Sequence, residues 1–221
     1  MDLRLSTEQE ELVGAFAALY GRYASPEQVR AAEPLGFDPV LWGRLAELGV
    51  PALGVAEADG GWGATLLDLV LVAEQHGRHV APAPLVESLA AARALAGCGE
   101  PAADLLRGAL DGTTSVTLAV RPARDGCATL VPAGAVADVA LVLDADRIVA
   151  VPLEGARTVV ENLGSMPLAD VLASGPTTVL ADGARAREVF EQAIDDWLVL
   201  TSAALVGLGA RALEIGAEYA K

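Results

Sequence analysis

Apolar residues in the first half of the chain recur at helical spacing. Those between positions 12 and 20 fall on one face of a helix that Ser6 can cap, and Ser25 and Asp38 can cap the next two, each before a first-turn proline. Further helices are predicted at about residues 26–33, 38–48, 66–77, 85–98 and 102–110, separated by glycines and prolines. The pattern therefore predicts an all-helical N-terminal domain over residues 1–112.

Beyond Gly112 the pattern changes to short runs rich in β-branched residues and broken by Gly, Pro and Asp. The runs are TTSVTLAV, ADVALVLDADRIVAVPL, ARTVVE and PTTVLA. The second run is predicted to be a hairpin with residues 144–146 at its turn, because strand-like segments flank a short polar connector. Residues 113–182 are therefore expected to form a small antiparallel β middle domain.

From Ala184 to Lys221 one helical pattern continues without interruption for about 35 residues, or roughly 50 Å at 1.5 Å per residue. Between Trp197 and Leu213 its apolar residues lie nearly all round the helix, so it needs partner elements on most sides. We expect residues 183–221 to be the start of a C-terminal helical domain that this sequence leaves incomplete. The expected fold class is α+β.

The charge balance narrows the range of partners. The 221 residues include 15 Lys and Arg against 30 Asp and Glu, a formal net charge of −15. Such a surface repels phosphate backbones and anionic lipid headgroups, so nucleic acid and membranes are not expected partners. The uncharged run 198–210 is also shorter than the roughly 20 residues of a membrane-spanning helix. A polyanionic ligand would need local donors, for example Arg side chains or helix N-termini.

The two cysteines indicate the compartment. Cys98 and Cys127 have neither the spacing of metal ligands nor the density of a disulfide scaffold, which is typical of a reducing environment. The first residues, MDLRLSTEQEE, offer no continuous apolar stretch of the kind found in secretory signals. We therefore expect a cytoplasmic protein with two ordinary thiols.

Two segments resemble acyl-CoA dehydrogenases. Residues 48–85, LGVPALGVAEADGGWGATLLDLVLVAEQHGRHVAPAPL, are similar to the family's run of Leu-Gly, apolar residues, Pro-Glu, Gly-Gly-x-Gly and a helix ending in Glu-x-x-Gly-Arg, with Ala56 in place of the usual proline before Glu57. The end of the chain, AALVGLGARALEIGAEYAK, resembles the helix that runs into the family's Arg-x-Gln-Phe-Gly motif. The order of the three predicted domains is also the family's order. The chain thus resembles a degenerate, actinobacterial-type member that is truncated at its C-terminal side.

The resemblance implies an FAD-dependent oxidoreductase of fatty acid or lipid metabolism. Such an enzyme oxidises an acyl-CoA thioester to its α,β-unsaturated product and passes the electrons to an electron-transfer flavoprotein. The family's catalytic glutamate usually lies beyond the position of Lys221; in some members it lies at the position of Trp197, which cannot accept a proton. The neighbouring Asp195 and Asp196 should point elsewhere, because each helical residue turns the side chain by about 100°. We therefore expect no catalytic residue in this chain, and no activity from the chain alone.

The same resemblance implies a changed flavin site. Aligning LAVRPARDG with the family's Thr-Glu-Pro motif places Val120, Arg121 and Pro122 at the cofactor-binding positions, and the family's later motifs are not recognisable. Val120 offers a backbone N–H but no hydroxyl, so either the flavin site is weakened or another subunit supplies the missing donors. Arg121 and Arg124 could meet the negative charge of a pyrophosphate or of reduced flavin, or they could be solvated surface residues.

A metal site is not expected. His76 and His79 lie three residues apart with Glu74 nearby, but no further ligand is evident, and cations are favoured at the end of a helix in any case.

Three functions remain open. The first is an acyl-CoA dehydrogenase subunit, the second a non-catalytic structural subunit that completes a partner's flavin site, and the third a flavin monooxygenase of the same fold that binds no CoA. The apolar final helix predicts association into a homo- or hetero-oligomer, because large apolar surfaces rarely stay bare on a monomer.

Overall fold

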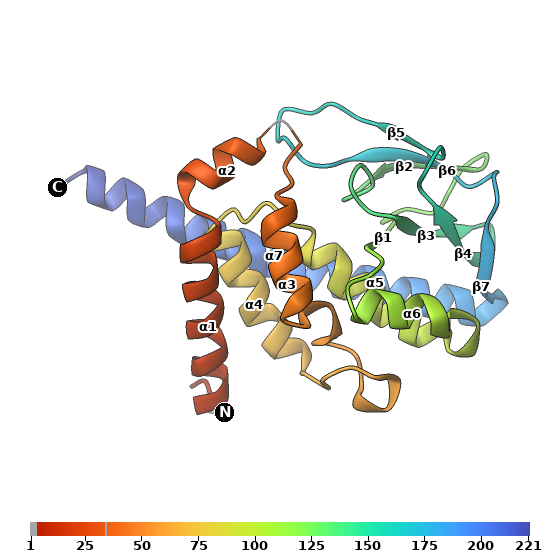
Figure 1. Cartoon of the computed structure of the whole chain (residues 1–221), viewed down its shortest axis with the longest axis horizontal. Helices are drawn as coiled ribbons and strands as arrows, with labels where there is room; N and C mark the ends of the chain where they lie inside the picture. Colours follow the sequence, from red (N-terminus) through yellow and green to blue (C-terminus); the bar gives the residue numbers. More distant parts are fainter. Residues whose placement is uncertain (1–3, 34) are drawn as a thin grey trace.

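A computed structural model describes residues 4–33 and 35–221 of the chain (Figure 1). Helices come first, strands follow, and one long helix ends the chain, so the fold belongs to the expected α+β class. The first helices are α1 (Thr7–Tyr23), α2 (Pro26–Ala32), α3 (Pro39–Glu47), α4 (Leu66–Arg78), α5 (Leu85–Cys98) and α6 (Ala103–Leu110), with short 3-10 turns η1 (Val50–Ala52), η2 (Glu57–Asp59) and η3 (Glu100–Ala102). The division into domains at 1–112, 113–182 and 183–221 stays a prediction.

The helix starts predicted from capping residues are confirmed. Ser6 Oγ accepts a hydrogen bond from the Gln9 amide at 3.3 Å, and Gln9 Oε1 accepts one from the Ser6 amide at 3.1 Å. Ser25 and Gln28 form the same reciprocal pair at the start of α2. Asp38 accepts hydrogen bonds from the first two free amides of α3. Local side-chain chemistry therefore sets where these helices begin.

The strands form two small sheets, with the orders β1-β3-β4-β7 and β2-β6-β5. The strands are β1 (Val116–Leu118), β2 (Cys127–Val131), β3 (Val139–Asp144), β4 (Arg147–Pro152), β5 (Arg157–Val159), β6 (Ala169–Leu172) and β7 (Thr178–Asp182). The predicted hairpin joins β3 to β4, and Ala145 in its turn has a φ of 55°. The described pairs are antiparallel with one exception: β1 lies parallel to β3, because the chain passes through the second sheet at β2 before it returns.

The long helix α7 (Gly183–Tyr219) runs lengthwise along the molecule, and its C-terminal end projects past α1 (Figure 1). It packs against α4 and α5. At the contact with α4 the backbones touch, because a Cβ on Gly207 would overlap the carbonyl oxygen of Glu74. The face away from α4 and α5 exposes apolar side chains, among them Leu198, Val199, Leu205, Val206, Leu213 and Ile215.

By length and composition alone, α7 is also the one helix in the described part of the chain that could cross a bilayer. Apolar core helices of globular proteins have the same property.

Candidate functional site

A cavity of about 580 Å³ lies between the helices and the second sheet. Its wall is formed by residues from α2 and the loop after it, the segment 76–87, the loop 163–167 and one side of α7, together with Ala133. Most of the lining side chains are apolar, and the volume falls in the range of small-molecule sites. This cavity is the candidate functional site.

The segment between α4 and α5 shapes the cavity wall. Val80, just after α4, has a left-handed φ of 49°, and Pro82 and Pro84 keep the chain from continuing as a helix. The Pro82 carbonyl accepts a hydrogen bond of 2.7 Å from the Asp38 amide, which ties this segment to the start of α3. The chain therefore turns within a few residues, and the first turn of α5 brings Glu87 to the cavity.

Glu87 places an ionisable carboxyl in the mostly apolar wall of this cavity. Its burial raises its pKa, and the nearby Trp197 indole partly offsets that rise. Trp197 Nε1 is nevertheless fully buried and has no hydrogen-bond partner of normal geometry among the described residues. Two hydrogen-bonding groups, one from α5 and one from α7, thus line a cavity whose side chains are mostly apolar.

His76 also lines the cavity, at the end of α4. Burial is the main cause that lowers its pKa to about 4; the nearby His79 adds to this effect, and the Ala83 backbone opposes it. His76 Nδ1 lies 3.1 Å from the hydroxyl of Tyr20, whose own pKa is raised by burial. His76 is therefore a neutral imidazole at neutral pH, held by a hydrogen bond.

The lowered pKa of His76 has a consequence for stability at acid pH. Since the folded pKa of about 4 lies below the ordinary 6.5, the unfolded chain binds this proton more readily as the pH falls between those values, and stability is lost. We expect His76→Gln to remove this contribution, so the variant's free energy of unfolding relative to wild type should rise by about 1–3 kcal/mol between pH 7 and pH 4. Urea unfolding at a series of pH values checks this. Glu87 titrates in both proteins and cancels in the difference, so a constant difference would contradict the assignment.

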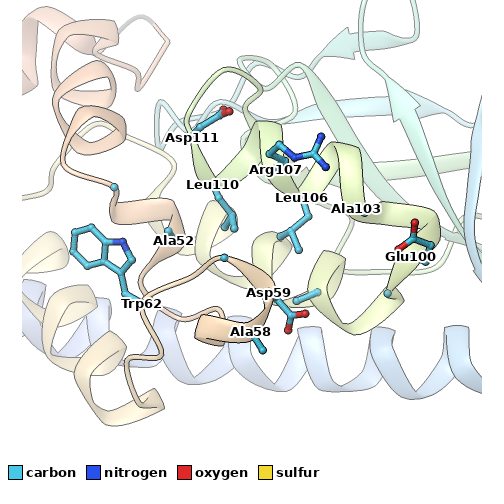
Figure 2. A pocket seen from close by; sticks show the side chains of 14 residues that line it. Ala52, Ala58, Asp59, Trp62, Glu100, Ala103, Leu106, Arg107, Leu110 and Asp111 are labelled. Carbon is cyan, nitrogen blue, oxygen red and sulfur yellow. The ribbon is translucent and has the colours of Figure 1, made fainter.

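A second cavity, of about 570 Å³, lies between η1, η2 and α6 (Figure 2). Figure 2 shows Trp62 on one side of it and Leu106 and Leu110 on the other. Its charged side chains are exposed, and Arg107 is already paired with Asp104 at 2.9 Å. The first cavity has the more apolar lining, so it is the better candidate.

Comparison with known proteins assigns the chain to a family. Residues 6–104 match the model of the acyl-CoA dehydrogenase N-terminal domain. The chain is 33% identical over 223 residues to acyl-CoA dehydrogenase IpdE2 of Mycolicibacterium smegmatis, covering 98% of this chain and 66% of that protein. The chain belongs to the acyl-CoA dehydrogenase family. The IpdE2 of Mycobacterium tuberculosis is 28% identical over 217 residues, with 97% and 64% covered, so the chain spans just under two thirds of these acyl-CoA dehydrogenases.

Solved structures agree with this fold. A steroid acyl-CoA dehydrogenase variant, Tcur3481-Tcur3483, has a TM-score of 0.80 at 26% identity, over 96% of this chain and 66% of that chain. The ChsE4-ChsE5 complex from Mycobacterium tuberculosis has a TM-score of 0.84 at 24% identity, over 99% and 68%. An FAD complex of PigA has a TM-score of 0.78 at 18% identity, over 100% and 70%, and it shares the fold.

Trp197, Asp195 and Asp196, the residues at and next to the family's alternative base position, have different surroundings in the structure. Trp197 lines the cavity, and its alignment with that base position stays a prediction. Asp195 is exposed, whereas Asp196 is buried and accepts hydrogen bonds from Arg93 Nε at 2.6 Å and Gln192 Nε2 at 3.1 Å. Asp196 does not line the cavity and is engaged in an ion pair, so its position is that of a structural residue.

The residues aligned with the family's flavin motif lie just after β1. Val120 is half-buried, and Arg121 and Pro122 are exposed; none of the three lines the cavity. The amides on either side, Ala119 and Ala123, donate to carbonyls of β3 at 2.8 Å each. Among the described residues no backbone partner is found for the Val120 and Arg121 amides. Their cofactor role stays a prediction.

The remaining residues considered from the sequence are a histidine with a local partner and two cysteines. His79 Nδ1 lies 2.9 Å from the carbonyl oxygen of Gln75, and both Cys98 and Cys127 are free thiols. The sequence reasoning missed Glu87, which places a carboxyl in the wall of the cavity. Its one signal was an acidic residue in a helix turn directly after Pro84, which also fits an ordinary surface position.

Proposed function

We propose that the protein is a subunit of an FAD-dependent oxidoreductase that dehydrogenates an acyl-CoA thioester between its α and β carbons. The observation that carries the proposal is the mostly apolar cavity between the segment 76–87, the loop 163–167 and α7. A cavity of about 580 Å³ has room for an acyl group, and its mostly apolar lining suits a hydrocarbon. Arg30, an exposed cation of the same cavity, offers a local donor for CoA phosphates on an otherwise acidic protein.

The segment 120–122 fits a flavin in part. Its two amides and the exposed Arg121 are donors that suit flavin carbonyl oxygens or a pyrophosphate, but the hydroxyl of the family motif is missing at Val120. FAD, when bound, supplies the acceptor for the hydride that leaves the β-carbon. The protein's own contribution in this proposal is to bind the acyl group, to hold it in one orientation and to keep the site dry.

A second candidate is a non-catalytic subunit that completes the flavin site of a related partner. Two sequence features favour it: Val120 lacks a donor hydroxyl, and Trp197, which the resemblance aligns with the alternative base position, cannot accept a proton. The exposed apolar side chains of α7 provide a surface for such a partner. We also propose that an electron-transfer flavoprotein accepts the electrons and that the protein is cytoplasmic.

The test is flavin retention followed by acyl-CoA binding. The purified protein is mixed with FAD, passed through a gel-filtration column and examined for the visible flavin absorption band. Isothermal titration with cyclohexylacetyl-CoA, and with free CoA as the control, then measures binding. We expect the acyl-CoA to bind more tightly than free CoA, because burial of apolar surface contributes about 25 cal/mol per Å².

The outcomes separate the candidates. Retained flavin with acyl-CoA binding supports the subunit of a dehydrogenase. Acyl-CoA binding without retained flavin points to a flavin site shared with a partner. Equal binding of acyl-CoA and free CoA would overturn the assignment of the cavity, and oxygen consumption without any CoA substrate would instead indicate a monooxygenase of this fold.

A further inference from the structure

The Glu87 carboxyl and the Trp197 indole N–H form a polar point in the wall of the cavity. Glu87 comes from the first turn of α5 and Trp197 from the middle of α7, and both line the same space. The Trp197 N–H is buried and has no hydrogen bond of normal geometry among the described residues, and it lies close enough to the Glu87 carboxyl to lower the pKa of that group. A buried donor that stays unpaired destabilises the fold, so its position calls for a ligand atom that can accept a hydrogen bond.

The side chains around this point are mostly apolar, with the hydroxyl groups of Ser165 and of Thr201, one helical turn beyond Trp197, in the same cavity. Val86, Ala204, Leu205 and Leu208 offer only hydrocarbon to the cavity. His76 faces the same space but is held by its contact with Tyr20. An acyl group that reaches the side of the cavity between α5 and α7 therefore meets Glu87 and Trp197 as polar partners.

Resting on the proposed acyl-binding function, we propose that Glu87 and Trp197 together recognise an oxygen atom on the acyl group. The preferred substrates then carry a carbonyl or hydroxyl oxygen on the part of the acyl group that enters the cavity, and plain hydrocarbon chains are disfavoured.

The chemistry of the two groups supports this preference. Burial raises the pKa of the Glu87 carboxyl above its ordinary value, and a carboxyl donates an O–H hydrogen bond when it is protonated. The Trp197 indole is a donor only. A carbonyl oxygen has two lone pairs and can accept from both donors at once. A hydrocarbon at this position leaves both donors unpaired, and sites built for a hydrogen bond reject analogues that lack it.

The test compares two ligands that differ by one oxygen. Cyclohexylacetyl-CoA and its ring-ketone counterpart, oxocyclohexylacetyl-CoA, are titrated calorimetrically into the purified protein. Wild type should bind the ketone about three- to tenfold more tightly. Glu87→Leu should abolish this ratio, whereas Glu87→Gln should keep most of it, because the amide retains an N–H donor. Trp197→Phe should reduce the ratio, and Glu191→Gln on the exposed face of α7 should leave it unchanged.

Each result bears on the proposal in a defined way. An equal affinity of wild type for the two ligands overturns oxygen recognition but leaves acyl-CoA binding intact. Failure of both ligands to bind wild type overturns the proposed function and this inference together. An equal loss of both ligands in Glu87→Leu, with an unchanged melting temperature, assigns Glu87 to the shape of the cavity and overturns the inference. A lost ketone preference in Glu87→Leu with retained cyclohexylacetyl-CoA binding supports it.

Discussion

Gly207→Ala should lower the free energy of unfolding by about 3 kcal/mol. A methyl group at this position would overlap the carbonyl oxygen of Glu74 and approach the Arg78 amide, both of which belong to the backbone of α4. Backbone cannot rotate away as a flexible side chain can, so the two helices must separate. Urea unfolding followed by circular dichroism measures the change, and a variant as stable as wild type would contradict this close packing.

The matched control lies two residues further along the same helix. A methyl group on Gly209 would meet no atom within 4 Å, so Gly209→Ala should stabilise the protein by about 0.5–1 kcal/mol through helix propensity alone. Gly77→Ala tests the contact from the other side, because its methyl group would overlap the carbonyl oxygen of Ala204. Combined with Gly207→Ala it should cost less than the sum of the two single changes, since the first already separates α4 from α7.

Asp196→Ala should cost about 2–3 kcal/mol of stability. Asp196 is buried and pairs with Arg93 Nε at 2.6 Å, while the same guanidinium donates to the Gly54 carbonyl at 2.8 Å. Removing the carboxylate leaves the Arg93 charge without its partner in a mostly enclosed position. The side chain of Arg93 keeps 28% of its exposure, so the cost should fall below the roughly 3–5 kcal/mol of a fully buried pair.

Asp195→Ala is the control for this prediction, because the neighbouring carboxylate is exposed. It should change stability by less than about 0.5 kcal/mol. Chemical unfolding of the two variants side by side measures the difference. Similar values for both would show that the ion pair with Arg93 contributes nothing beyond an ordinary surface charge.

Local signals in the sequence determined much of the helical part. Ser6, Ser25 and Asp38 cap the helices predicted to follow them, and α5 has its predicted bounds, 85–98. The β3–β4 hairpin also forms around its predicted turn. These features depend on residues within a few positions of one another, so their free energies are local and can be read from the sequence.

Strand pairing depended on the tertiary structure. The strands β2 and β6 were not predicted, and the parallel pairing of β1 with β3 was not expected. A short strand contains too few residues to show a clear alternation of apolar and polar positions. The direction in which two strands pair depends on the path of the chain between them.

The sequence by itself determined the order of elements, the likeness to acyl-CoA dehydrogenases and the apolar character of α7. Only the tertiary structure decided which polar side chains became buried. Asp195 and Asp196 are adjacent in sequence, yet only Asp196 meets Arg93. Glu87 lies in the first turn of α5, where the helix dipole alone favours acidic residues. Only the packing of α7 beside it makes this position part of a cavity. Burial and pKa are properties of neighbours brought together from distant segments, and local sequence does not contain them.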